Sequence, residues 1–183
     1  NLRYADEQHA RLYAELGPDD ALLFVSDHGE EFWEHGGFEH GHSLYDELLR
    51  VPLVLRAPAA LALPRGAVDD APVSLQDVAP TLLELADLAP LANASGRSLL
   101  GAARGEAGEL TALAARDLAF GRPLYGAERW GLTNGVEKYL SGPAGEALFD
   151  LASDPGETRD LNGETPGAHA AIAGLRSRLT KAL

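Results

Sequence analysis

Chemically reactive side chains are concentrated between residues 21 and 52. This stretch opens with the apolar run Ala-Leu-Leu-Phe-Val and then changes abruptly to Ser26-Asp27-His28-Gly29-Glu30. A carboxylate and an imidazole at adjacent positions can bind one cation, and the glycine after them leaves room for close approach. Mixed oxygen and nitrogen donors suit Ca, Mg, Mn or Zn, so Asp27 and His28 are predicted metal ligands. The simpler alternative is that Asp27 caps a turn and His28 packs.

Three further histidines follow within the same stretch, at positions 35, 40 and 42. An imidazole can donate a proton, bind metal or, once protonated, pair with an anionic oxygen, so each is a candidate for a hydrolytic site. We expect at least one of them to face the predicted metal ligands and the others to be solvated. The acids of the loop are expected to be solvated, except for one that orients a histidine. Trp33 and Phe38 are expected to anchor the loop rather than to bind substrate.

The apolar patterns before residue 105 indicate alternating helices and strands. Helices are expected at residues 2–16, at 44–49 after a Ser43 cap and at 75–87 after a capping box from Ser74 to Asp77, and strands at 21–26 and 51–55. The continuous apolar run of the first strand is typical of a parallel strand covered on both faces, in half of a β-α-β unit. Residues 57–72 are expected to be a loop, and residues 90–109 a loop with a short helix.

After Thr111 the pattern changes to short strands. Candidates lie at 112–120, 125–133, 136–140 and 146–151, with the hairpin signal Asn134-Gly135 between two of them. A turn at 154–157 and a helix at 166–183 carrying Ile172, Leu175 and Leu179 complete the chain. The predicted fold class is therefore α/β, with part of a larger catalytic domain over 1–105 and a small antiparallel subdomain with a terminal helix over 106–183.

Composition limits the classes of partner. The 183 residues carry a formal net charge of -13, which argues against binding to nucleic acid or to an anionic membrane surface. An anionic substrate stays possible because a bound cation reverses the local field. The chain has no cysteine, and no apolar run approaches the roughly 18 residues of a membrane span. It has no methionine and begins within a helical pattern, so we expect it to be the C-terminal part of a longer protein.

Several ordered motifs resemble the C-terminal half of sulfatases, within the alkaline phosphatase superfamily. The motifs are Val25–Glu30, Glu34–Gly36, His40–Glu47, Arg50–Leu53, Asp77–Leu85, Gly96–Leu100 and Leu148–Leu161. The resemblance implies a metal-dependent hydrolase of small-molecule or glycan sulfate esters, with calcium as the first choice of cation and Mg, Mn or Zn as alternatives. It also implies that Asp27 and His28 hold the cation. Family members often carry a lysine or histidine just before the Ser-Leu-Tyr segment, in contact with the transferred group; His40 fits that place best, followed by His42.

The resemblance also implies a nucleophile that this chain does not contain. Sulfatases use a formylglycine made in a Cys/Ser-x-Pro/Ala-x-Arg motif, and no serine here is followed by that pattern. The motif is expected in a missing N-terminal part, without which the fragment should be inactive.

Two other functions remain open at this point. Many sulfatases have asparagine where this chain has His28, and an aspartate-histidine pair is similar to phosphonate and phosphate ester hydrolases and to a large bacterial sulfatase group. The first alternative is therefore a phosphoester or phosphonate hydrolase or a phosphoglycerol transferase of the same superfamily. The second is a non-catalytic metal-binding module.

Overall fold

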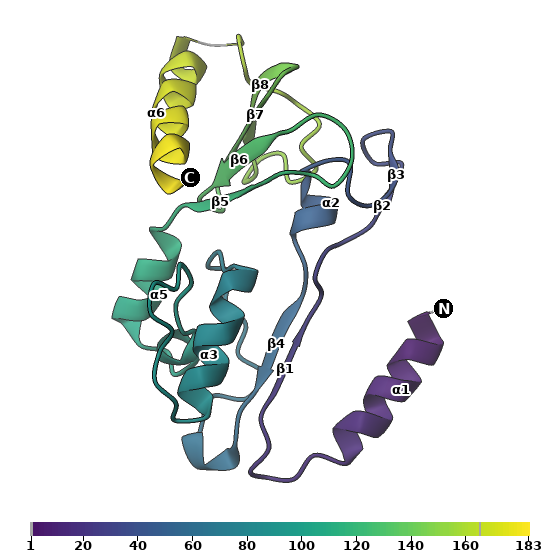
Figure 1. Ribbon diagram of the computed structural model, residues 1–183, viewed down its shortest axis with the longest axis vertical. Helices are drawn as coiled ribbons and strands as arrows, with labels where there is room; N and C mark the ends of the chain where they lie inside the picture. Colours follow the sequence, from purple (N-terminus) through teal and green to yellow (C-terminus); the bar gives the residue numbers. More distant parts are fainter. Residues whose placement is uncertain (1, 165) are drawn as a thin grey trace.

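The computed structural model describes residues 2–164 and 166–183 and contains helices and strands in two regions (Figure 1). In Figure 1 the lower region holds α3 and α5 beside the pair β1 and β4, and the upper region holds a four-stranded sheet with α6 on one face. The elements are α1 (Leu2–Ala14), β1 (Leu22–Val25), β2 (Glu31–Phe32), β3 (Phe38–Glu39), α2 (Asp46–Leu49), β4 (Leu53–Arg56), η1 (Ala59–Leu61), η2 (Leu75–Asp77), α3 (Val78–Leu85), α4 (Leu100–Ala103), α5 (Ala107–Ala114), β5 (Leu118–Gly121), β6 (Trp130–Thr133), β7 (Glu137–Gly142), β8 (Gly145–Asp150) and α6 (Pro166–Ala182).

The first strand pairs antiparallel with β4, with Leu22 opposite Arg56 and Val25 opposite Leu53. Phe24 is 38% exposed and Val54 is 57% exposed, so one face of this pair is open in the described residues. The expectation of a parallel strand covered on both faces is therefore wrong for the pairing seen here. Between β1 and β4 the chain runs through residues 26–45, the reactive loop, and through the four-residue helix α2. No crossover helix of the kind that parallel strands need lies between the two strands.

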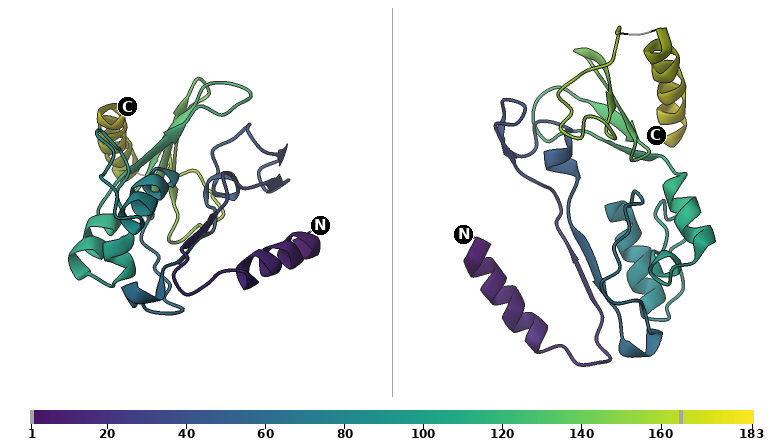
Figure 2. Two further views of the ribbon diagram at one scale, coloured as in Figure 1. Left: turned by 60° about the horizontal axis from the view of Figure 1, so that its bottom comes forward. Right: turned by 180° about the vertical axis from the view of Figure 1, so that it is seen from behind.

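Helix α1 stands apart from the rest of the structure (Figure 2). The predicted helix is confirmed, and it ends at Ala14, shortly before Gly17-Pro18. It has no buried residue, and its ring contacts to the body are the edge of His9 against Phe24 and the Tyr13 ring beneath the Arg56 guanidinium.

The predicted capping box before α3 is confirmed. Ser74 accepts the N–H of Gln76, and the Asp77 carboxylate accepts the N–H of Ser74 at 2.7 Å. Asp77 is fully buried and also binds the Arg116 guanidinium and the N–H of Arg97. Burial opposes the charged form, but these donors hold the pKa of Asp77 below its usual range. One carboxylate therefore ties the start of the helix to two later segments.

The predicted antiparallel sheet is confirmed, with the order β5-β6-β7-β8. Asn134 accepts the N–H groups of Val136 and Glu137, and Gly135 takes the left-handed φ of 85° that this turn requires. The strand candidate at 112–120 is wrong in its first part, because residues 107–114 form α5 and β5 begins at Leu118. Alanine and leucine dominate that segment and favour a helix. The contact between α4 and α5 crosses the predicted domain boundary after residue 105, so this boundary stays a prediction.

Helix α6 packs on one face of the sheet and forms the main core. Ile172, Leu175 and Leu179 of the predicted helix are buried against Leu132, Tyr139 and Leu148 of the sheet. The helical prediction for the terminal segment is confirmed over Pro166–Ala182. Among the described residues no helix has the length and apolarity needed to cross a membrane.

A buried lysine joins this sheet to the segment that carries the reactive loop. Lys138 of β7 has no exposed surface, and its Nζ lies 2.8 Å from Asp46 Oδ1 and 2.8 Å from Glu157 Oε1. It also lies over the ring of Phe120, 5.6 Å from the centroid. Asp46 begins α2, and Glu157 belongs to the turn after β8. The lysine thus fixes the upper sheet against the end of the reactive loop.

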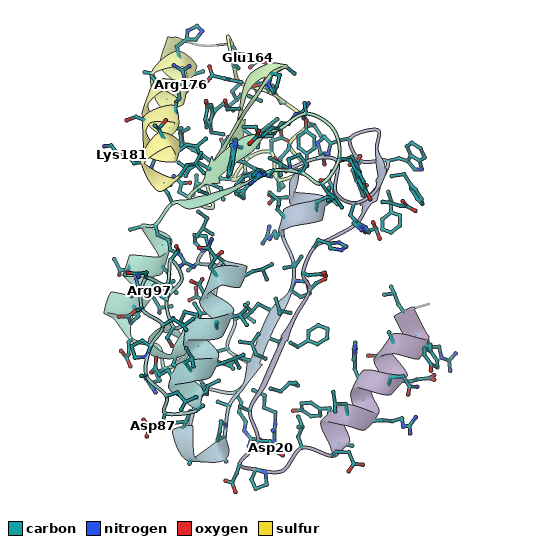
Figure 3. The ribbon with its side chains drawn as sticks, in the orientation of Figure 1. Asp20, Asp87, Arg97, Glu164, Arg176 and Lys181 are labelled. Atoms are coloured by element: carbon teal, nitrogen blue, oxygen red, sulfur yellow. The ribbon has the colours of Figure 1, made fainter. Side chains whose placement is uncertain are left out.

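Replacing this lysine tests that role. In Lys138→Met, Asp46 and Glu157 lose their shared cation while staying partly or fully buried, so we expect a loss of about 3–5 kcal/mol in the free energy of unfolding, measured by urea denaturation. The control is Lys181→Met at the exposed end of α6, labelled in Figure 3, which should change stability by less than about 0.5 kcal/mol. Equal stability of the two variants would contradict the interpretation.

Candidate metal and anion site

Asp27 and His28 lie directly after β1, and their side chains converge. The His28 Nδ1 atom lies 2.7 Å from the carbonyl oxygen of Gly29, which can only accept, so Nδ1 carries the proton. Its Nε2 atom lies 3.7 Å from Asp27 Oδ2. A nitrogen lone pair and a carboxylate oxygen therefore face the same point, and the Asp27 side chain is 87% exposed. This is a pair of donors suited to a cation.

The backbone holds this turn closely against α2. The N–H of Gly29 donates to the carbonyl oxygen of Leu48 at 2.9 Å. A Cβ atom at Gly29 would lie 1.9 Å from the carbonyl oxygen of Glu47. The glycine is required, but the room it leaves is filled by the backbone of α2 rather than by the cation that the sequence suggested.

His40 is the histidine that lies beside the predicted metal ligands. Its ring stacks on that of His28, with centroids 4.0 Å apart and an angle of 27° between the planes. Its Nδ1 atom lies 3.0 Å from Glu30 Oε1, so this nitrogen donates to the carboxylate. The opposite nitrogen, Nε2, makes no hydrogen bond within residues 2–164 and 166–183. His40 therefore has one ring nitrogen available beside His28.

His42 is held by a buried carboxylate. Its Nε2 atom lies 2.7 Å from Oε2 of Glu31, whose side chain is 1% exposed. Glu31 Oε1 also accepts the N–H groups of Gly37 at 2.5 Å and His35 at 3.2 Å. Burial opposes its charge, but these donors hold the pKa of Glu31 below its usual value. Glu31 thus orients His42 as Glu30 orients His40, so two acids of the loop orient histidines where one was expected. The prediction that Ser43 caps the helix is wrong, because α2 has Tyr45 at its N-cap, and the Ser43 hydroxyl instead donates to Glu31 Oε2 at 3.4 Å.

His35 points away from this pair. Its Nδ1 atom lies 2.7 Å from Glu47 Oε1, its Nε2 atom lies 3.2 Å from the carbonyl oxygen of Glu157, and its ring stacks on Tyr45 at 3.6 Å. Of the three candidate histidines, the structure brings one, His40, beside the predicted metal ligands.

The aromatic residues of the β2–β3 hairpin are exposed. Trp33 and Phe38 stack on each other at 5.6 Å, and Trp33 is 66% exposed. They do not anchor the loop in a core formed by the described residues.

Sequence reasoning missed the loop between β5 and β6. Tyr125 donates its N–H to the carbonyl oxygen of Gly41 at 2.7 Å, and the side chains of Leu124 and Tyr125 flank Gly41. Gly41 lies between His40 and His42, so the antiparallel sheet contributes to the rim of the site. No local pattern in residues 122–129 announces this long-range contact.

The donor set of the described residues is incomplete for a cation. Within residues 2–164 and 166–183 no three His, Cys, Asp or Glu side chains are grouped closely enough to hold a metal ion. Asp27 and His28 fit a divalent cation through chemistry and orientation, but they supply two ligands where such ions take at least four.

Solved structures of other proteins match this chain in fold. A solved structure titled "Structure of BT4656 in complex with its substrate D-Glucosamine-2-N, 6-O-disulfate" matches with a TM-score of 0.81 and 22% identity, over 97% of this chain and 37% of that one. The phosphonate monoester hydrolase SpPMH from Silicibacter pomeroyi matches with a TM-score of 0.68 and 23% identity, over 95% and 36%. The predicted α/β fold is thereby confirmed.

Sequence similarity narrows the assignment further. Residues 1–88 match the family model described as Sulfatase. Arylsulfatase K of Mus musculus is 32% identical over 164 residues, covering 79% of this chain and 27% of the relative. The chain belongs to the sulfatase family. It spans about a third or less of the length of the curated relatives it matches.

Removing the carboxylate tests the metal assignment. In the complete protein, Asp27→Asn keeps the size of the side chain but removes its charge, so affinity for the divalent cation should fall about 100-fold or more. Elemental analysis after dialysis against graded cation concentrations measures this. The control is Asp19→Asn, an exposed aspartate before β1, which should leave the metal content unchanged. Full cation occupancy in Asp27→Asn would remove Asp27 from the site.

Proposed function

We propose that this chain is part of a metal-dependent enzyme that hydrolyses sulfate esters. The observation that carries the proposal is the convergence of His28 Nε2 and Asp27 Oδ2, 3.7 Å apart at the end of β1, with the His40 ring stacked beside them. Membership of the sulfatase family supports the reaction class.

In this proposal Asp27 and His28 hold the cation, and His40 contacts the transferred group. When bound, the cation would neutralise charge that develops on the sulfate oxygens as the ester bond breaks. Glu30 accepts the Nδ1 proton of His40, which leaves Nε2 for contact with the substrate. A protonated Nε2 can donate to a sulfate oxygen or to the leaving oxygen. Calcium is the first choice of cation, with Mg, Mn or Zn as alternatives.

His42 is the second candidate for contact with the transferred group. Because Glu31 fixes its Nε2 proton, the nitrogen left for substrate is Nδ1. His42 is more enclosed than His40, with 29% of its side chain exposed against 44%. This favours His40 for direct contact and His42 for support of the loop.

The proposed substrate is a small-molecule or glycan sulfate ester. The matched structure titled with its substrate D-glucosamine-2-N,6-O-disulfate is of another protein, and its fold match supports a sulfated sugar as the class of substrate proposed for this one. A chain with a net charge of -13 repels a sulfate ester at long range, so binding would depend on the local positive charge of the cation and the histidines.

The proposed nucleophile is a formylglycine outside these 183 residues. The chain has no cysteine and no serine in the required motif, so by itself it should be inactive. A phosphonate or phosphate ester hydrolase is the second candidate, favoured by the Asp-His pair and by the fold match to a phosphonate monoester hydrolase. The TM-score of that match, 0.68, is below the 0.81 of the complex with D-glucosamine-2-N,6-O-disulfate.

Parallel assays of the complete protein separate the two reactions. With 4-nitrophenyl sulfate and 4-nitrophenyl phosphate under the same conditions, and with a phosphonate monoester as third substrate, we expect the largest kcat/KM for the sulfate ester. A larger kcat/KM for either phosphorus ester would overturn the proposal in favour of the second candidate.

Truncating His40 tests its proposed role. His40→Ala removes the donor but no metal ligand, so we expect kcat for the sulfate ester to fall about 100-fold or more while the fold and the metal content are retained. The matched control is His9→Ala on α1, outside the site, with unchanged kcat. Normal kcat in His40→Ala would move the role to His42.

A further inference from the structure

We propose that His35 is a positioning residue that works as an imidazolium, holding the loop of His40 and His42 against α2 and the turn after β8. Its effect on turnover rests on the proposed function, whereas its charge state does not. Sequence reasoning treated His35 only as a candidate for the site itself.

The hydrogen bonds of His35 require both ring nitrogens to be donors. Nδ1 lies 2.7 Å from a carboxylate oxygen of Glu47, and Nε2 lies 3.2 Å from the backbone carbonyl of Glu157. Neither an ionised carboxylate nor a carbonyl can donate, and a neutral imidazole carries only one N–H. Deprotonation would therefore place a ring lone pair against an acceptor and break one of the two contacts.

The polar groups that contact His35 are all hydrogen-bond acceptors, and the cation beside them is Lys138, which lies against the Glu157 carboxylate. Glu47 faces it from α2, Tyr45 stacks on it at 3.6 Å from the start of that helix, Glu157 faces it from the later turn, and Glu31 accepts its backbone N–H within the hairpin. Burial lowers the pKa of His35, but the hydrogen bonds to Glu47 and the Glu157 carbonyl outweigh it and raise the pKa above the usual value.

The contact of His35 with Glu157 connects it to the buried lysine. The Glu157 side chain lies against Lys138 Nζ and accepts the N–H of Asp46 at 2.6 Å, while its backbone carbonyl accepts from His35. One residue thus receives donors from β7, from α2 and from the reactive loop. His35 therefore connects the reactive loop to this cluster.

The direction of the pH effect follows from the raised pKa. The contribution of His35 is fully present below the pKa of an unfolded histidine, about 6.5, and is lost as the pH rises through the folded pKa. His35 lies in the hairpin whose Glu31 binds His42 and whose C-terminal strand leads into His40. Release of His35 should therefore disturb both histidines without touching the metal ligands.

The experiment is histidine NMR on the complete protein together with the pH dependence of kcat. Ring ¹⁵N shifts of His35, assigned by its loss in His35→Gln, should show two N–H groups at pH 7. In Glu47→Gln, which keeps an acceptor but removes the charge, the His35 pKa should fall, and the alkaline limb of the kcat profile should move to lower pH with it. In His35→Gln that limb should be absent and kcat should be about 10-fold lower at pH 6. The control is His169→Gln on the exposed side of α6, with an unchanged profile.

The measurements separate the charge state of His35 from its positioning role and from the proposed function. A single N–H on His35 at pH 7, or a His35 pKa that does not change in Glu47→Gln, would overturn the imidazolium assignment whether or not the protein hydrolyses sulfate esters. A His35 pKa that falls in Glu47→Gln while the kcat profile stays fixed would overturn the positioning role. An inactive protein whose His35 titrates as expected would reject the proposed function and retain the imidazolium.

Discussion

The structure depends on the buried ammonium group of Lys138. It lies between Asp46, which begins α2, and Glu157, in the turn after β8, so one cation fixes the antiparallel sheet against the segment that follows the reactive loop. The cost of removing a lysine from water is offset here by two carboxylates and by the Phe120 ring. Glu157 extends the cluster to His35 through its backbone carbonyl. Two contacts therefore fix the loop that carries the site. His35 bonds to the charged cluster of Lys138 and Glu157, and Gly29 packs against the backbone of α2.

In the candidate site each histidine ring donates a proton to a neighbouring carbonyl or carboxylate oxygen. His28 gives its one ring proton to the Gly29 carbonyl, which leaves Nε2 opposite the Asp27 carboxylate. His40 gives a proton to Glu30 and His42 gives one to Glu31, so a neighbouring acid fixes which nitrogen of each ring is left for other partners. The crowding of acids and histidines, visible at once in the sequence, therefore has two uses. Some acids orient rings, and Asp27, which is 87% exposed, lies 3.7 Å from His28 Nε2.

The sequence predicted the elements whose signals are local and failed where the outcome depends on distant partners. The Ser74–Asp77 capping box, the Asn134-Gly135 hairpin and the apolar face of α6 were all correct, because each is determined within a few residues. The apolar run at β1 was correctly taken as a strand, but its pairing direction is set by β4 and by the loop between them. The resemblance placed His40 first because it lies just before the Ser-Leu-Tyr segment, but no local pattern predicted the contacts of His35. Those contacts are made by Glu47 and Glu157, which lie 12 and 122 residues away in the chain. Likewise, the contact of Tyr125 with Gly41 has no short-range signature.

The central claim is that one cation lies between the Asp27 carboxylate and His28 Nε2. A crystal structure of the complete protein with Mn²⁺, located by its anomalous scattering, tests this most directly. The account predicts an anomalous peak about 2.0–2.6 Å from a carboxylate oxygen of Asp27 and from Nε2 of His28, with Nδ1 still bound to the Gly29 carbonyl. A peak bound through Nδ1 of His28, or one that contacts neither side chain, would contradict it.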